Sequence, residues 1–121
     1  MSHPFREAVE QRDAEALFAC LAPDVRFRSP AVFRPYEGRE AVSTVLAAAV
    51  QTFEDFRYTD ELRGEDGLVA LIFEARVGER DLQGIDLLRD GPDGVSELTV
   101  MIRPLSGLTA LAEQIGARLQ A

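Results

Sequence analysis

The chain has 121 residues, 46% of them hydrophobic, which is typical of one globular domain. Its net charge of −8 arises from nine Asp and twelve Glu against thirteen Arg, with no Lys. This charge argues against nucleic acid or an anionic membrane as a partner, because both repel an acidic protein. There is no apolar run of transmembrane length, and MSHPFREAVE lacks the apolar core of a signal peptide, so we expect a cytoplasmic protein.

The chain has one cysteine, Cys20, and one histidine, His3. A lone cysteine excludes an internal disulfide, and the two residues are too few for a Cys/His zinc site. We therefore expect no metal ion and no cofactor. Cys20 lies on the apolar stripe of a predicted helix and is interpreted as a core residue, whereas His3 is expected to be disordered with the N-terminus.

The first half of the chain predicts two short helices, a strand and a long helix. The first helix is expected over 4–12, and Asp13 is placed as the N-cap of the second. Residues 25–30 (VRFRSP) alternate apolar and charged side chains, which is typical of a half-buried strand. The aromatic loop 29–38 then leads into a long helix over 39–53.

From residue 54 onward the hydrophobic pattern changes to a period of two, which predicts strands joined by hairpins. The expected elements are strands over 56–64, 68–78, 81–90 and 95–104 and a final helix over 107–119, capped by Ser106.

Helices followed by hairpin-linked strands indicate an α+β fold. We expect one curved antiparallel sheet wrapped around the N-terminal helices to form a cone, with an extra C-terminal helix, as a single domain over residues 1–121. If the apolar Val100 and Ile102 of the last strand face the inside of the cone, alternation turns Met101 and Arg103 toward solvent.

The stretch GIDLLRD (84–90) places an aspartate inside a predicted strand. Because side chains alternate between the two faces, Asp86 shares a face with Gly84 and Leu88 and points away from Ile85 and Leu87. If that face is dry, burial raises the pKa of the Asp86 carboxyl and suits it to exchange a proton near neutral pH.

The order of the elements, together with FACLAPDVRFRSP, EGREAV and GIDLLRDGPDG, resembles the nuclear transport factor 2-like superfamily on its SnoaL-like and ketosteroid-isomerase-like side. The resemblance covers nearly the whole chain. It implies that Asp86 matches an aspartic acid that stays protonated and donates a hydrogen bond to a developing enolate. It also places Phe5 at the position of the isomerase's second donor, a tyrosine, and Ser29 at the position of its aspartate base.

Neither replacement supplies the missing group, since phenylalanine has no donor and serine without a partner base accepts no proton near neutral pH. The usual steroid-isomerase mechanism is therefore disfavoured. SnoaL-type polyketide cyclases need chiefly one acid/base carboxylate, which Asp86 could supply alone. A limonene-epoxide-hydrolase-like site ranks low, because no second aspartate is expected to face Asp86. A non-catalytic ligand-binding or interaction domain of the same fold is the other alternative.

These considerations predict a small apolar ligand bound inside the cone, with Asp86 as the catalytic residue. The apolar residues Ile72, Ile85 and Leu87, expected on the convex face of the sheet with polar residues around them, predict a homodimer formed through that face. The expected ligand-binding residues are Phe27, Ser29, Phe33, Tyr36, Phe53, Tyr58, Leu71, Phe73, Leu88 and Val100.

Overall fold

The computed structural model of the chain describes residues 2–120. Within that range, no helix is both long enough and apolar enough to cross a membrane. The elements in chain order are α1 (Pro4–Glu10), α2 (Ala14–Cys20), β1 (Leu21–Arg28), β2 (Tyr36–Glu37), α3 (Arg39–Thr52), β3 (Glu54–Arg63), β4 (Leu68–Val77), β5 (Arg80–Gly91), β6 (Gly94–Arg103) and α4 (Leu105–Gln120).

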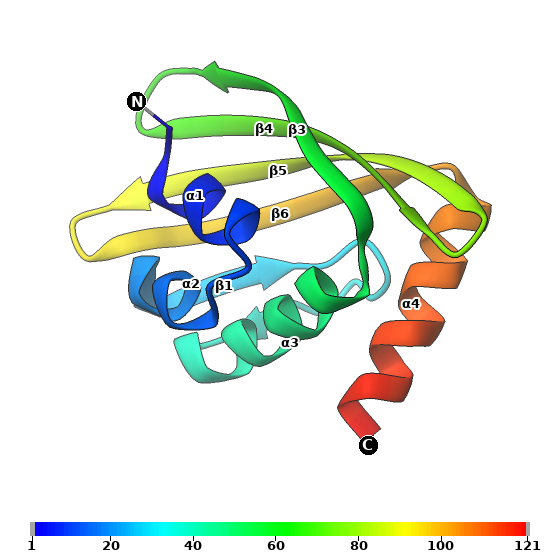
Figure 1. Cartoon of the computed structure of the whole chain (residues 1–121). Coiled ribbons are helices and arrows are strands. Elements are labelled where there is room, and N and C mark those ends of the chain that lie inside the picture. The colour runs from blue at the N-terminus through cyan, green and yellow to red at the C-terminus, as the bar shows by residue number, and fades with distance from the viewer. Residues whose placement is uncertain (1, 121) are drawn as a thin grey trace.

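The strands form one sheet in the order β2-β1-β6-β5-β4-β3, which curls around α1, α2 and α3 (Figure 1). The predicted α+β cone with an extra C-terminal helix is confirmed. Adjacent strands are antiparallel except β1 and β6, which pair in parallel. We expected an antiparallel sheet throughout, and this one pair differs from that expectation. No hairpin fixes the direction of β1 against β6, because α3 and three long strands separate them in the chain.

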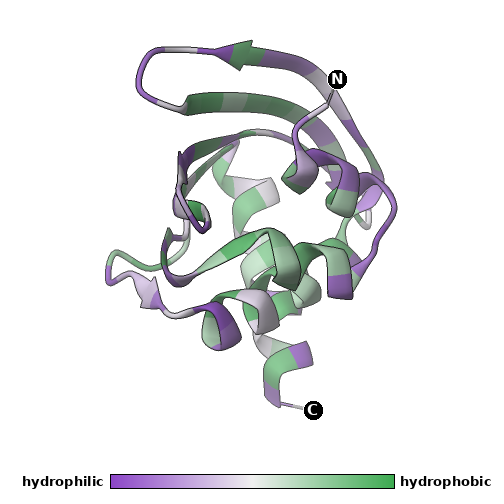
Figure 2. Cartoon of the chain, turned by 90° about the vertical axis from the view of Figure 1, so that its left-hand side faces the viewer, coloured by the Kyte–Doolittle hydropathy of each residue, from purple (hydrophilic) through white to green (hydrophobic). Residues whose placement is uncertain are grey.

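The concave face of the sheet is apolar. Every second residue of β4 is buried, from Val69 to Val77, and this strand is mostly hydrophobic in Figure 2, where the edge strand β3 is largely hydrophilic. The same alternation buries Asp86 beside Leu88 in β5. The period-two pattern of the sequence thus predicted correctly which face of β4 and β5 is dry.

The main differences from the prediction are at β1, β2 and α4, whereas the other elements differ by one or two residues at their ends. β1 begins at Leu21 rather than Val25, and its pairing with β6 shifts register before Arg26, so the strand accommodates Pro23. β2 lies inside the predicted loop and pairs with β1. α4 begins at Leu105, which places Ser106 in its first turn rather than at the N-cap.

Gly107 allows α4 to pack closely against the sheet. A Cβ at this position would lie 2.9 Å from the backbone oxygen of Asp81 and 2.9 Å from the Cβ of Leu82, both in β5. The absence of a side chain is therefore what brings the start of α4 against the end of the cone, where the helix runs away from the sheet (Figure 1).

Candidate functional site

A cavity of about 370 Å³ lies between the concave face of the sheet and helices α1, α3 and α4. Its wall is mainly aliphatic and aromatic, as is typical of small-molecule sites. The predicted site residues on this wall are Phe27, Ser29, Tyr36, Phe53, Tyr58, Phe73, Asp86 and Val100.

Three residues predicted for the site lie elsewhere. Phe33, at the tip of the loop between β1 and β2, is fully exposed and does not line the cavity. Leu71 and Leu88 do face the inside of the cone, but both are completely buried in the hydrophobic core. Alternation along a strand identifies the face of a residue, whereas reaching the cavity also depends on what the helices cover.

Asp86 is the one acidic side chain on the cavity wall among the described residues. It is 7% exposed, and its Oδ2 accepts a hydrogen bond of 2.8 Å from the hydroxyl of Tyr58. Asp86 lies in β5 and Tyr58 in β3, so the two side chains meet across the intervening strand β4. This pair is the charged or polar end of a mainly apolar space.

Burial raises the pKa of Asp86 to about 7, and the hydrogen bond from Tyr58 offsets part of this rise by favouring the charged form. Burial, reinforced by the charge of Asp86, also raises the pKa of Tyr58 well above its ordinary value. Tyr58 is therefore a neutral donor at physiological pH, and Asp86 populates both its acid and its carboxylate form near neutrality.

Aromatic rings surround this pair. Phe73 packs edge-to-face against Tyr58, with ring centroids 6.3 Å apart, and stacks on Phe56 at 4.9 Å. Gly84, the partner of Phe73 in β5, leaves room for the Phe73 ring, because a Cβ there would lie 2.3 Å from its Cζ. The rings exclude water from the carboxyl, which is the physical cause of its raised pKa.

The resemblance matched Phe5 to the isomerase's tyrosine donor and Ser29 to its aspartate base, and neither residue supplies that group here. Phe5 lies buried on the cavity wall and has no donor. Ser29 also borders the cavity, where its Oγ accepts hydrogen bonds from the backbone N–H groups of Ala31 and Val32, at 3.1 and 3.2 Å. Asp86 and Tyr58 thus form the hydrogen-bonded pair on the cavity wall that could act on a proton.

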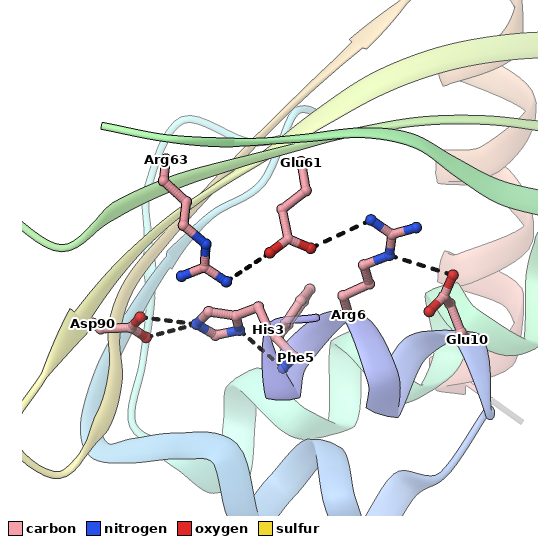
Figure 3. Close-up of polar contacts among 7 residues, drawn as sticks. All are labelled: His3, Phe5, Arg6, Glu10, Glu61, Arg63 and Asp90. Atoms are coloured by element: carbon pink, nitrogen blue, oxygen red, sulfur yellow. Dashed lines mark hydrogen bonds and ion pairs between the residues drawn. The ribbon is translucent and has the colours of Figure 1, made fainter. Parts of the chain in front are cut away.

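His3 is ordered and buried, contrary to the expectation of a disordered terminus. Its Nδ1 accepts a hydrogen bond from the backbone N–H of Phe5, which leaves Nε2 as the donor to the Asp90 carboxylate, at 2.8 and 2.9 Å (Figure 3). His3 therefore caps α1 and ties it to β5. In this way it holds Phe5 against the cavity.

Arg6, also in α1, forms ion pairs with Glu61 and Glu10 (Figure 3). Its Nη1 donates to Glu61 at 3.3 Å, its Nε lies 3.4 Å from Glu10, and its guanidinium carbon lies 5.5 Å from the centre of the Tyr58 ring. Burial raises the pKa of Glu61, but hydrogen bonds from Arg63 and Arg6 outweigh it and bring the pKa below its ordinary value. The Arg6 guanidinium, held by Glu61 and Glu10, thus packs over the Tyr58 ring in a cation–π contact.

A second hollow, of about 540 Å³, is lined by charged residues of β3, β4, β5 and β6, and two of its three arginines have carboxylate partners. Arg57 pairs with Glu74, and Arg76 with Asp55. Because these charges neutralise one another and the hollow is open to solvent, the cavity around Asp86 is the better candidate site.

Sequence reasoning missed the helical part of the cavity wall. α4 contributes Leu108, Leu111, Ile115 and Leu119, a stripe that the sequence displays at helical spacing but that was not assigned to the site. α3 contributes a further set of apolar residues, namely Val45, Leu46, Ala49 and Val50. How these two helices sit over the sheet depends on tertiary packing, which the sequence pattern does not specify.

Residues 3–103 match the SnoaL-like domain family. The chain is similar to a steroid delta-isomerase from Pseudomonas aeruginosa, with 44% identity over 96% of this chain and 86% of that chain and a TM-score of 0.91. It is also similar to an uncharacterized protein with a cystatin-like fold from Silicibacter pomeroyi, with 34% identity over 98% and 84% of the chains and a TM-score of 0.91.

A protein with a ketosteroid isomerase-like fold from Catenulispora acidiphila, in complex with trimethylamine, shares 19% identity over 91% and 89% of the chains, with a TM-score of 0.66. That likeness shows the fold alone. Among curated proteins, no match is found.

Proposed function

The chain belongs to the SnoaL-like domain family, and we propose that it binds a small, mainly apolar carbonyl compound in the cavity, with Asp86 as acid/base or hydrogen-bond donor. The observation that carries this proposal is the buried Asp86 carboxyl, bonded to Tyr58, at the polar end of an apolar space. The similar steroid delta-isomerase supports a carbonyl compound as the ligand class.

In its protonated form, Asp86 donates a hydrogen bond to the carbonyl oxygen of the ligand and stabilises the enolate that forms when a water molecule takes the proton from the neighbouring carbon. The carboxylate form instead removes a proton from the carbon beside the carbonyl, and Tyr58 stabilises the charged carboxylate by donating to it. Return of the proton to another carbon is an isomerisation, and attack of the enolate carbon on a second carbonyl is a cyclisation.

The alternative is a binding domain without catalysis, and the observation that favours it is the state of the two other matched positions. Phe5 offers no second donor, and Ser29 uses its oxygen to accept two backbone hydrogen bonds. In this alternative, Asp86 and Tyr58 orient the ligand and do no more.

Deuterium exchange separates the two functions. A small cyclic ketone is incubated in D₂O with the wild-type protein, and exchange of the hydrogens beside the carbonyl is followed by NMR, together with binding. An enzyme accelerates exchange, and Asp86→Asn abolishes the acceleration while ligand still binds. The control Asp81→Asn, an exposed acid on the same strand, behaves as wild type.

Ketone binding without exchange in the wild type would identify a binding domain. If the wild type bound no ketone, or if Asp86→Asn bound and exchanged the ketone as the wild type does, the proposed function would be wrong.

We also propose that two copies associate through the convex face of the sheet, where Ile72, Ile85 and Leu87 are half-buried and Met101 is 54% exposed. Such apolar residues on a sheet face are typical of an interface. A cytoplasmic location is a further proposal, based on the single unpaired cysteine, Cys20.

A further inference from the structure

α4 forms one wall of the cavity, although it lies entirely outside the residues that match the SnoaL-like family. The residues that it turns toward the cavity follow the spacing of a single helical face. They are Leu108, Leu111, Ala112, Ile115, Gly116 and Leu119. An element added after the matched domain therefore shapes the site, while Asp86 and Tyr58 lie within the matched domain.

The two glycines of α4 occupy opposite environments. Gly107 is packed so closely against β5 that a Cβ would clash, whereas a Cβ at Gly116 would meet no atom within 4 Å. Gly116 shares the cavity-facing side of the helix with Ala112 and Leu119, so the open space beside it belongs to the cavity. A glycine in the middle of a helix costs stability relative to alanine, and no close packing explains it here.

Gly116 and Asp86 both line the cavity but come from different elements. α4 starts at the sheet and its C-terminal half runs away from it (Figure 1), whereas Asp86 lies in the sheet itself. The end of α4 is joined to the end of α3 by a hydrogen bond of 3.3 Å from Arg118 to the backbone oxygen of Gln51. The cavity wall therefore includes Asp86 in β5 and the face of α4 up to Gly116 and Leu119.

We propose that α4 sets the size of the ligand and that Gly116 leaves space for the apolar end of a carbonyl compound whose oxygen lies at Asp86. This inference rests on the proposed function and adds the ligand's shape, which is a carbonyl group with one apolar chain or flat ring. The cavity volume of about 370 Å³ lies in the lower part of the range for small-molecule sites, roughly 300–1,000 Å³.

The test uses straight-chain methyl ketones of increasing length, with binding measured by calorimetry on the whole protein. In the wild type, each added buried methylene raises affinity about fourfold until the cavity is full. In Gly116→Leu the rise stops earlier, and the longest ketones bind at least about tenfold more weakly while the shortest are unaffected. Gly116→Ala gives an intermediate effect, and circular dichroism verifies that each variant is folded.

Ala117→Leu is the matched control, because it adds the same side chain one residue away on the exposed side of α4. It should follow the wild-type series at every length. If Gly116→Leu does so too, the inference is wrong, and the proposed function still stands provided that Asp86→Asn weakens all the ketones equally.

If no ketone binds the wild type, the proposed function fails, and naphthalene, which has no carbonyl, then tests the inference alone. Naphthalene binding that is lost in Gly116→Leu but kept in Ala117→Leu upholds the role of Gly116. Naphthalene binding that is absent from the wild type, or equal in all three proteins, overturns it.

Discussion

At the scale of single residues, the burial of Asp86 works against the stability of the folded protein. An ionised carboxyl loses its hydration in an apolar cavity, and one hydrogen bond from Tyr58 does not replace it. The folded state therefore holds the Asp86 proton more tightly than the unfolded chain does, which is the meaning of a pKa raised from 3.8 to about 7. Such unfavourable groups are often found at functional sites.

This burial predicts how stability depends on pH. Because the folded pKa of Asp86 is the higher one, its stabilising contribution is complete below the unfolded value and is lost as pH rises toward about 7. Between about pH 5 and about pH 8 the wild type should lose roughly 3 kcal/mol of unfolding free energy relative to Asp86→Asn. Urea denaturation of both proteins measures this, and a constant difference between them would contradict it.

The inward direction of Asp86 was predictable from the sequence, because a period of two decides the face of a strand residue. Its hydrogen bond to Tyr58 was not, since it depends on the register of three strands and β3 shifts its register beside Tyr58. The burial of His3 was not predictable either, because its carboxylate partner, Asp90, lies 87 residues away in the chain.

At the scale of elements, α4 offers a matched pair of substitutions with opposite signs. Gly116→Ala adds a methyl group in open space and should stabilise the protein by about 0.5–1 kcal/mol, because alanine loses less backbone entropy in a helix. Gly107→Ala pushes α4 away from Asp81 and Leu82 and should destabilise by about 1–3 kcal/mol. Thermal unfolding compares the two variants, and equal signs would show that α4 does not pack as described.

The stability of helix α1 depends on His3, which caps the helix and bonds it to β5. His3→Ala removes both the cap on Phe5 and the bond to Asp90, and should cost about 1–2 kcal/mol of unfolding free energy. Asp13→Ala, which removes the exposed cap of α2, should cost less, because Asp13 bonds only to Ala16. Chemical denaturation of both variants tests this order, and a larger loss for Asp13→Ala would reverse it.

The long elements were predicted because their own hydrophobic period identifies them, as in α3 and β4. β2 was not, because Tyr36 and Glu37 are a strand only through their pairing with β1. The start of β1 before Pro23 was missed for a related reason. The strand residues there are fixed by the partner strand β6 and not by a local preference.

At the scale of the whole molecule, a dimer through the convex face requires apolar contact at its centre. Met101, exposed beside Ile85 on that face, is the residue to change. The wild type should sediment as a dimer at micromolar concentration and Met101→Glu as a monomer, because a buried unpaired charge opposes association. Leu105→Glu, at an exposed position of α4, should leave the dimer intact. A wild type that sediments as a monomer would reject this interface.

In the cone as a whole, the residues that match the family supply Asp86, and α4 forms one wall of the cavity around it. The fold was predictable because many weak local signals agree in order along the chain. The cavity was only partly predictable, since its volume is what remains after α1, α3 and α4 pack against the sheet.

The central claim is that Asp86 is a buried acid that is largely protonated below neutral pH. A carbon-detected NMR titration of its carboxyl group, assigned by comparison with Asp86→Asn, tests this directly. The expected midpoint is about pH 7. A midpoint near the ordinary aspartate value, about 4, would show that water reaches the carboxyl, and the proposed chemistry would then have no basis.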